Sequence, residues 1–265
     1  MCKSRAEISR VTRSKREARA SYDKMSRWYD VVAGHFESKH RDIALAQMNI
    51  QEGEIILEIG CGTGRSLLAL AQSVDGSGRV YGIDISEGML DISRAKVRRA
   101  RLSDRIILIC GDAADLPFRP HSFDAILVIF TLELFDTPEI PIVLCQWRKA
   151  LRDTGRICVV AMSKKGKVGL VMRLYEWAHR RFPSYVDCRP ILVWKALKDA
   201  GLHIVDASEV SGWTLPVEVV VAKKRYHPLE QPECDRTTEN KKRSSPRSPT
   251  QVRQDSPKRP GQTAK

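Results

Sequence analysis

The sequence predicts an α/β fold in which helices cover both faces of a mainly parallel sheet. Short segments rich in Ile, Val and Leu alternate along the chain with longer segments whose apolar residues recur every three or four positions. The first apolar segment runs directly into a glycine-rich turn, ILEIGCGTGR, at residues 56–65. Strands and helices that alternate in this way form doubly wound sheets.

The expected strands are short, apolar and bounded by turn residues. They lie at residues 54–60, 78–85, 105–110, 123–130, 156–162, 203–210 and 216–222. The fifth follows the turn residues Asp153 and Gly155. No internal repeat is visible.

The expected helices lie between these strands, at residues 65–73, 86–99, 139–151, 168–181 and 190–200. Ser86 is placed to cap the second helix, because its hydroxyl can accept a bond from a free backbone N–H. Gly201 is placed to end the last one. Helix 168–181 is apolar on one side and basic on the other, so it can roof a pocket, lie against a membrane or pack on the core.

The formal net charge of +13 is concentrated at the two ends of the chain. Residues 1–24 carry +5 and residues 223–265 carry +7, which leaves +1 for residues 25–222. A nucleic-acid-reading domain more often carries its cations on folded surface. The charge pattern therefore argues against nucleic acid as the partner of the folded body.

Three parts are expected: a basic N-terminal segment at 1–21, one folded domain at 22–225 and a basic tail at 226–265. The tail is rich in Pro, Ser, Lys and Arg and is expected to be disordered. It can be a solubilising tail or a weak anchor to anionic lipid or RNA.

The seven cysteines are scattered, with no CxxC pair. This favours reduced, buried thiols over a disulfide or metal set, and no metal is expected. No apolar stretch approaches the ~20 residues that span a bilayer, and the N-terminus lacks the apolar core of a signal peptide. We expect a cytoplasmic protein, although the Arg-rich N-terminus leaves a transit peptide open.

The glycine-rich turn is a candidate nucleotide site, because glycine lets the backbone approach a ligand closely. The dinucleotide fingerprint would need a glycine at position 65, where Arg65 stands, and the Gly-Lys-Ser/Thr of a P-loop is missing. Glu58, two residues before the first glycine, is an unfavourable neighbour for a diphosphate. It is a favourable one for an ammonium or sulfonium group.

Two further acids follow the next two strands. Asp84 ends the second strand and can accept hydrogen bonds from both hydroxyls of a ribose. Asp112 follows the third strand and can accept from an adenine amino group, with Ala113 close to the ring. Acids at the ends of three successive strands, behind a G-x-G-x-G turn, form a far more specific pattern than any one of them.

This pattern resembles the class I S-adenosylmethionine-dependent methyltransferases over residues 22–222. Within that superfamily the chain is most similar to the ubiquinone/menaquinone-biosynthesis C-methyltransferase group (methyltransferase type 11). The early segment YDKMSRWYDVVAGHFE, with two Tyr-Asp pairs seven residues apart, is typical of that group. The other matching segments are LEIGCGTG (57–64), GIDISEGML (82–90), GDAADLPF (111–118), FDAILVIFTLEL (123–134) and LRDTGRICVV (151–160).

The resemblance implies a Rossmann-like sheet of seven strands with the last strand antiparallel, and S-adenosyl-L-methionine as the cofactor. It implies that Glu58, Gly60 and Gly62 line the methionine end, with Gly64 of the same turn also among the cofactor-binding residues. Around the nucleoside it implies a set of contacts. These are Asp84 on the ribose with Ile85 beside it, Met89 near the adenine, Asp112 and Ala113 on the adenine, and Ile129 to Thr131 as the floor.

The catalytic residue stays open. Methyl transfer from a sulfonium needs alignment and desolvation more than a general base, so no conspicuous constellation is expected. Tyr22 and Tyr29 share a helical face and either cap the cofactor or pack as ordinary aromatics. His35, Tyr29 and Glu133 are the candidates for proton transfer, each with an ordinary structural alternative.

The acceptor class can be narrowed. Exocyclic base N-methylation usually uses an Asn/Asp-Pro-Pro-aromatic motif after the fourth strand and base C5-methylation a Pro-Cys, whereas this chain has IFTLEL at 129–134. A small or lipid-soluble acceptor is expected, through quinone-like C-methylation or phospholipid N-methylation, with peripheral membrane contact left open. The rival hypotheses are an RNA-associated methyltransferase that uses the basic termini and a non-catalytic nucleotide-binding protein. The oligomeric state cannot be read.

Overall fold

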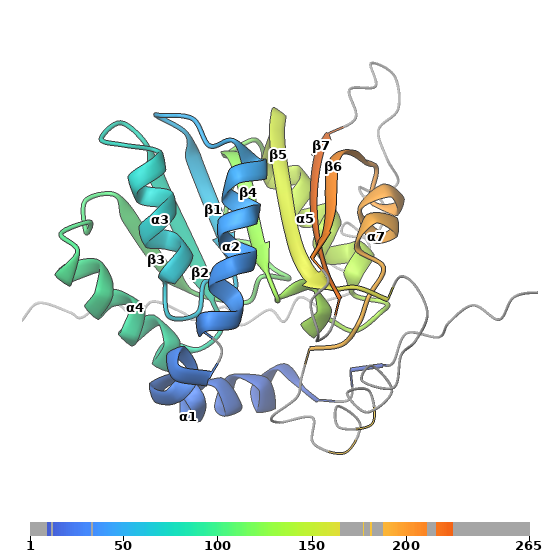
Figure 1. Ribbon diagram of the computed structural model, residues 1–265, viewed down its shortest axis with the longest axis horizontal. Coiled ribbons are helices and arrows are strands. Elements are labelled where there is room, and N and C mark those ends of the chain that lie inside the picture. Colours follow the sequence, from blue (N-terminus) through green and yellow to red (C-terminus); the bar gives the residue numbers. More distant parts are fainter. Residues whose placement is uncertain are drawn as a thin grey trace, which may run out of the picture. The chain divides into compact units, whose positions relative to one another are not determined.

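The computed structural model (Figure 1) describes residues 10–11, 13–32, 34–164, 177, 181, 188–210 and 216–224, without the side chains of residues 31–36. Most of the expected helix at 168–181 and the whole of the expected tail lie outside these residues. Trp177 and Arg181, the two described residues of that helix, are helical and exposed.

The strands form one seven-stranded sheet in the order β3-β2-β1-β4-β5-β7-β6. Only β7 runs antiparallel to its neighbours, so the predicted fold class is confirmed. The strands are β1 (Ile55–Ile59), β2 (Arg79–Asp84), β3 (Ile106–Cys110), β4 (Phe123–Ile129), β5 (Leu151–Met162), β6 (Leu202–Val210) and β7 (Val217–Lys224).

Helices cover both faces of the sheet, each over its own apolar core. The α2, α3 and α4 helices contribute to one core and α5 and α7 to the other. They are α2 (Gly34–Met48), α3 (Arg65–Ser73), α4 (Glu87–Arg99), α5 (Ile140–Ala150) and α7 (Val193–Asp199), with a short 3₁₀ turn, η1 (Leu132–Leu134), after β4. The predicted cap is present, since Ser86 Oγ accepts from the Met89 N–H at 3.1 Å.

The α1 helix (Lys15–Val32) stands apart from these two layers. It lies across the carboxyl ends of the strands, below the sheet in Figure 1. Its start is a capping box, in which Glu17 accepts from the backbone and hydroxyl of Ser14 at 2.8 and 2.7 Å. The sequence prediction placed no separate helix over residues 15–32 or 34–48.

Two expected boundaries shift. The β5 strand begins at Leu151 instead of residue 156, because a register shift against β4 lets the expected turn around Gly155 continue the strand. The last helix begins at Val193 instead of Pro190, because Ile191 forms a bridge with Ser163 beside the sheet.

The cysteines depart in part from the expected set of buried, reduced thiols. Cys61 and Cys158 are buried and free. Cys110 is free but exposed, and Cys145 is disulfide-bonded. Within the described residues, no helix is long and apolar enough to cross a bilayer.

Candidate functional site

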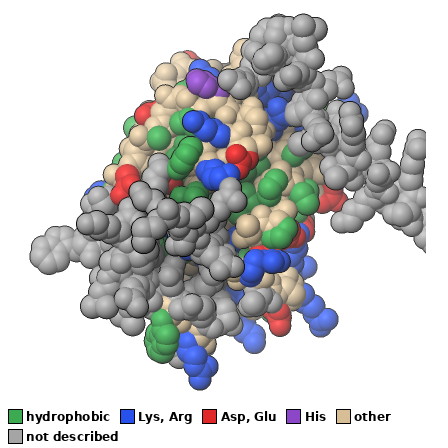
Figure 2. Space-filling view, turned by 90° about the vertical axis from the view of Figure 1, so that its right-hand side faces the viewer, with side chains coloured by type: hydrophobic (Ala, Val, Ile, Leu, Met, Phe, Trp, Pro, Cys, Tyr) green, Lys and Arg blue, Asp and Glu red, His purple; other side chains and the backbone are tan. Residues whose placement is uncertain are grey.

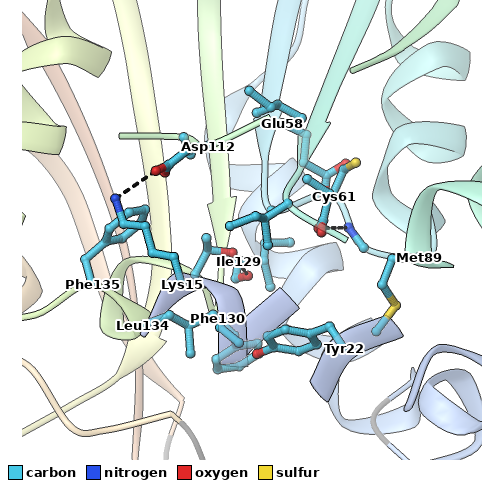
Figure 3. A pocket seen from close by; sticks show the side chains of 18 of the residues that line it. Lys15, Tyr22, Glu58, Cys61, Met89, Asp112, Ile129, Phe130, Leu134 and Phe135 are labelled. Carbon is cyan, nitrogen blue, oxygen red and sulfur yellow. Dashed lines mark hydrogen bonds and ion pairs between the residues drawn. The ribbon is translucent and has the colours of Figure 1, made fainter. Parts of the chain in front are cut away.

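A cavity of about 510 Å³ lies at the carboxyl ends of the central strands, between the sheet and α1 (Figure 3). This is the edge at which open α/β sheets bind ligands. Ten of the eleven expected cofactor residues line it: Tyr22, Glu58, Gly60, Gly62, Asp84, Ile85, Met89, Asp112, Ala113 and Ile129. The eleventh, Gly64, does not.

The three glycines of the turn have different neighbours, although all have positive φ. A Cβ on Gly60 would lie 2.1 Å from Thr131 Oγ1, so this glycine lets β1 and the loop after β4 approach each other. A Cβ on Gly64 would lie 2.2 Å from Ser93 Oγ, so that glycine serves the contact with α4. Gly62 has nothing within 4 Å of its Cβ position, which leaves its face open to the cavity.

Glu58 is buried at the closed end of the cavity, at the top of Figure 3. Burial raises its pKa well above the ordinary value, and the neighbouring carboxyl of Glu37 raises it further. Its Oε2 has no hydrogen-bond partner among the described residues. A buried, unpaired carboxylate oxygen next to a second carboxylate suits a bound cation, because a cation offsets both the desolvation and the repulsion.

Asp84 joins the glycine turn to the start of α4. Its Oδ2 accepts from the Gly62 N–H at 2.8 Å, and its Oδ1 accepts from the Ser86 N–H at 2.9 Å. Burial raises the pKa of this carboxyl, and the two backbone bonds lower it. Each oxygen keeps a lone pair, so the group can still accept from the two hydroxyls of a ribose.

Asp112 is already paired, which the sequence did not predict. Lys15 Nζ lies 2.8 Å from its Oδ2, as the dashed line in Figure 3 shows, and the Ala114 N–H lies 2.9 Å from its Oδ1. A ligand amino group that binds this carboxylate therefore shares it with the ammonium of Lys15. The start of α1 thus forms part of the site.

One wall of the cavity is apolar. Figure 3 shows Ile129, Phe130 and Leu134 on the side of β4 and η1, with Met89 opposite them. Thr131 also lines the cavity, so all three residues of the expected floor at 129–131 face it. Such a wall accommodates an aromatic or aliphatic group and excludes water from it.

The two Tyr-Asp pairs explain how α1 is held over the cavity. Tyr22 and Tyr29 line it, with ring centroids 6.4 Å apart. Asp23 accepts from the hydroxyl of Ser86 at 2.6 Å, at the start of α4. Asp30 accepts from Thr63 Oγ1 at 2.6 Å, in the glycine turn. The tyrosines therefore face the ligand space, and the aspartates fasten the helix to the two elements that shape it.

The three catalytic candidates lie in different surroundings. The Tyr29 hydroxyl lies 2.6 Å from Glu37 Oε1, and burial raises the pKa of Glu37. Glu133 is completely buried and does not line the cavity. The side chain of His35 lies outside the described residues.

Two arginines that the sequence analysis did not single out hold segments beside the cavity: Arg10 lines it, and Arg189 supports the loop after β4. Arg10 Nε lies 2.8 and 2.9 Å from the two carboxylate oxygens of Asp136, and its guanidinium holds the pKa of that carboxyl well below its usual range. The buried Arg189 donates to the Glu133 and Phe135 carbonyls and so fixes the loop after β4. The sequence could indicate only that these arginines are positively charged, and a positive charge alone does not predict which residue it contacts.

Comparison with known proteins agrees with this geometry. Residues 56–155 match a family model described as a methyltransferase domain. The demethylmenaquinone methyltransferase of Geobacillus stearothermophilus is 35% identical over 176 residues, which cover 66% of this chain and 73% of the relative. The chain belongs to the class I S-adenosylmethionine-dependent methyltransferases. The corresponding protein of Symbiobacterium thermophilum is also 35% identical, but the match covers only 55% of this chain and 59% of that protein.

Solved structures of this methyltransferase fold are similar at low sequence identity and support the fold alone. A SAM-dependent methyltransferase from Aquifex aeolicus has a TM-score of 0.54 at 20% identity, over 69% of this chain and 88% of its own. The cyclase SpnF has a TM-score of 0.69 at 19% identity, over 84% of this chain and all of its own.

Proposed function

We propose that this methyltransferase transfers the methyl group of S-adenosylmethionine to a ring carbon of a quinol-like, lipid-soluble acceptor. The observation that carries the proposal is the 35% identity to a demethylmenaquinone methyltransferase over 73% of that protein. The apolar wall beside the glycine turn agrees with an acceptor of this kind.

The residues that line the cavity fit the cofactor, and the best observation is the buried, partnerless oxygen of Glu58. Glu58 would hold the methionine ammonium, and Asp84 the ribose hydroxyls. Asp112 and Ala113 would hold the adenine edge, with Met89 against the ring. The open face of Gly62 would let the backbone contact the ligand. When bound, the cofactor supplies an electrophilic methyl group on a good leaving group.

The protein itself would align the two reactants and exclude water from them. The apolar wall formed by Ile129, Phe130 and Leu134 would orient the acceptor ring and exclude water. Tyr22 and Tyr29 would close the opposite side, because α1 is fastened to the glycine turn and to α4. Alignment of two bound reactants can lower a barrier by about 7–11 kcal/mol.

We also propose that the enzyme works at a membrane surface, where a lipid-soluble acceptor is found. The chain would consist of a basic N-terminal segment at 1–21, a methyltransferase domain at 22–225 and a tail at 226–265.

Within the described residues, no group of three or more His, Cys, Asp or Glu side chains could hold a metal ion.

The test is methyl transfer to defined acceptors. The purified chain is incubated with methyl-labelled S-adenosylmethionine and either demethylmenaquinol or phosphatidylethanolamine in detergent, and the organic phase is analysed. Label in the quinol supports the proposal, whereas label in the phospholipid alone overturns the acceptor. Label in neither acceptor, with S-adenosylmethionine still bound, would favour a non-catalytic binding protein. Transfer to added RNA would favour the RNA-associated alternative.

A further inference from the structure

The outer face of α1 carries cations that form no ion pair with a described residue. The helix contains three acids, and each is engaged in the fold. Glu17 caps its start, Asp23 accepts from Ser86, and Asp30 accepts from Thr63. Asp23 and Asp30 are therefore directed at the fold, whereas the exposed carboxylate of Glu17 shares the outer face and offsets one of its positive charges.

The cations on the other side behave differently. Arg16, Lys24 and Arg27 are exposed, and none forms an ion pair with a described residue. At a helical period of 3.6 they fall on one side of α1, opposite Tyr22 and Tyr29. In Figure 2, Lys and Arg side chains project from the lower edge of the molecule, at the height that α1 has in Figure 1.

A large aromatic side chain lies beside Lys24, at the edge of this basic face. Trp28 is 69% exposed, next to Arg27 and four positions after Lys24. Trp sits favourably at the boundary between water and hydrocarbon, because its ring is apolar and its N–H is polar. A basic helix face with an exposed Trp is what an interfacial helix presents to anionic lipid.

A bilayer bound to this face of α1 would lie close to the cavity. Tyr22 and Tyr29, on the inner side of the same helix, line the cavity. A bilayer that touched the outer side would lie one helix diameter, about 10 Å, from the site. A lipid-soluble acceptor would then reach the cavity without crossing water.

We propose that the outer face of α1, formed by Arg16, Lys24, Arg27 and Trp28, docks the enzyme on an anionic phospholipid bilayer. Only the role of this contact, the delivery of a lipid-soluble acceptor, rests on the proposed function, since docking itself needs no turnover. The alternative anchors, the expected helix at 168–181 and the basic tail, lie mostly or wholly outside the described residues.

The test is sedimentation of the full-length protein with vesicles of phosphatidylcholine, with and without phosphatidylglycerol. The variant replaces Arg16, Lys24 and Arg27 together with Gln. Each cation near an anionic leaflet strengthens binding about fivefold, so we expect partitioning to fall on the order of 100-fold. The matched control removes three exposed cations elsewhere, Arg98→Gln, Arg99→Gln and Arg101→Gln, and we expect a change of only about fivefold or less for it.

A second readout follows Trp28. Its fluorescence should shift to the blue when anionic vesicles are added, and this part of the signal should be missing from Trp28→Phe. Equal losses in the two triple variants would overturn the proposal. So would binding that depends only on Lys241, Lys242 and Arg243 of the tail, or binding to RNA but not to vesicles.

The two proposals can fail separately. Methyl transfer to an acceptor in detergent should be unchanged in the α1 triple variant, because none of its three residues lines the cavity. If transfer is missing in every form while vesicle binding still depends on α1, the acceptor is wrong and the docking face stands.

Discussion

Replacing Gly62 with Ala separates ligand contact from fold stability. Gly62 has φ +50°, and a Cβ built on it meets nothing within 4 Å. The change therefore adds no clash inside the protein. Its cost is the left-handed backbone of a non-glycine residue, about 1–2 kcal/mol, which is offset in part by the lower entropy of the unfolded chain. For a domain of about 200 residues, a loss of about 1 kcal/mol lowers Tm by roughly 2–4 °C.

The effect on the cofactor should be much larger. If the cofactor lies against the turn, the new methyl group occupies its space and displaces it from hydrogen-bond distance of its partners. Losing one charge-assisted hydrogen bond, about 1.5–3 kcal/mol, corresponds to roughly 10- to 150-fold weaker binding. Calorimetric titration with S-adenosylhomocysteine measures this directly.

Two other glycines supply the controls. Gly53 has φ +81° and lies outside the cavity, so Gly53→Ala should cost similar stability and leave the affinity unchanged. Gly60→Ala should be more destabilising than either, because its Cβ would lie 2.1 Å from Thr131 Oγ1. A folded Gly62→Ala protein that binds S-adenosylhomocysteine within twofold of the parent would refute the placement of the cofactor.

Three further changes test the rest of the site. Asp84→Asn should weaken S-adenosylhomocysteine binding about 100-fold, since one amide oxygen must replace two carboxylate oxygens. The control Asp91→Asn, on the exposed side of α4, should leave the affinity unchanged. Equal affinities of the two variants in calorimetry would exclude the ribose contact. Glu58 retains its proton in the folded chain at pH values where the unfolded chain, with a pKa near 4.5, has lost it, so the free energy of unfolding should fall as pH rises through this window. In urea unfolding at several pH values, Glu58→Gln should reduce this fall in the free energy of unfolding and make the ligand-free protein more stable at neutral pH. The same variant should bind the cofactor more weakly. If the free energies of unfolding of parent and variant change with pH in the same way, the burial argument is wrong. Arg189→Met should lower the free energy of unfolding by about 2–4 kcal/mol, because it leaves buried carbonyls of the loop after β4 without a donor; a change below about 0.5 kcal/mol in urea unfolding would show that the loop holds itself.

The sheet was predictable because its signals are local. Each strand is a short apolar run, and the side chains that mark its end, such as Asp84, follow in the sequence. The carboxyl ends of parallel strands meet at one edge, so listing those side chains amounts to listing the wall of the cavity. Most of the expected cofactor residues lie there for this reason, whereas Tyr22 comes from α1 and Met89 from α4.

The contacts that close the cavity were not predictable, because they join residues far apart in the chain. Lys15 and Asp112 are 97 positions apart, and Arg10 and Asp136 are 126 apart. Gly64 does not line the cavity, for a related reason. Its pattern is shared with Gly60 and Gly62, but its neighbour is Ser93 of α4, which no motif indicates.

The fold alone does not decide the reaction, as the similarity to the cyclase SpnF at a TM-score of 0.69 shows. The charges at the site support methyl transfer independently of the similarity to known methyltransferases. A turn with Glu58 at its closed end repels a diphosphate and favours a cation, and Asp84 beside it suits a ribose. If both substitutions left S-adenosylhomocysteine binding intact, the cavity would still be a pocket in a methyltransferase fold, but its acids would have some other role. The seven-residue Tyr-Asp spacing of α1 then becomes the sharper clue, because it places two aromatic side chains over the cavity and two carboxylates on the elements that support it.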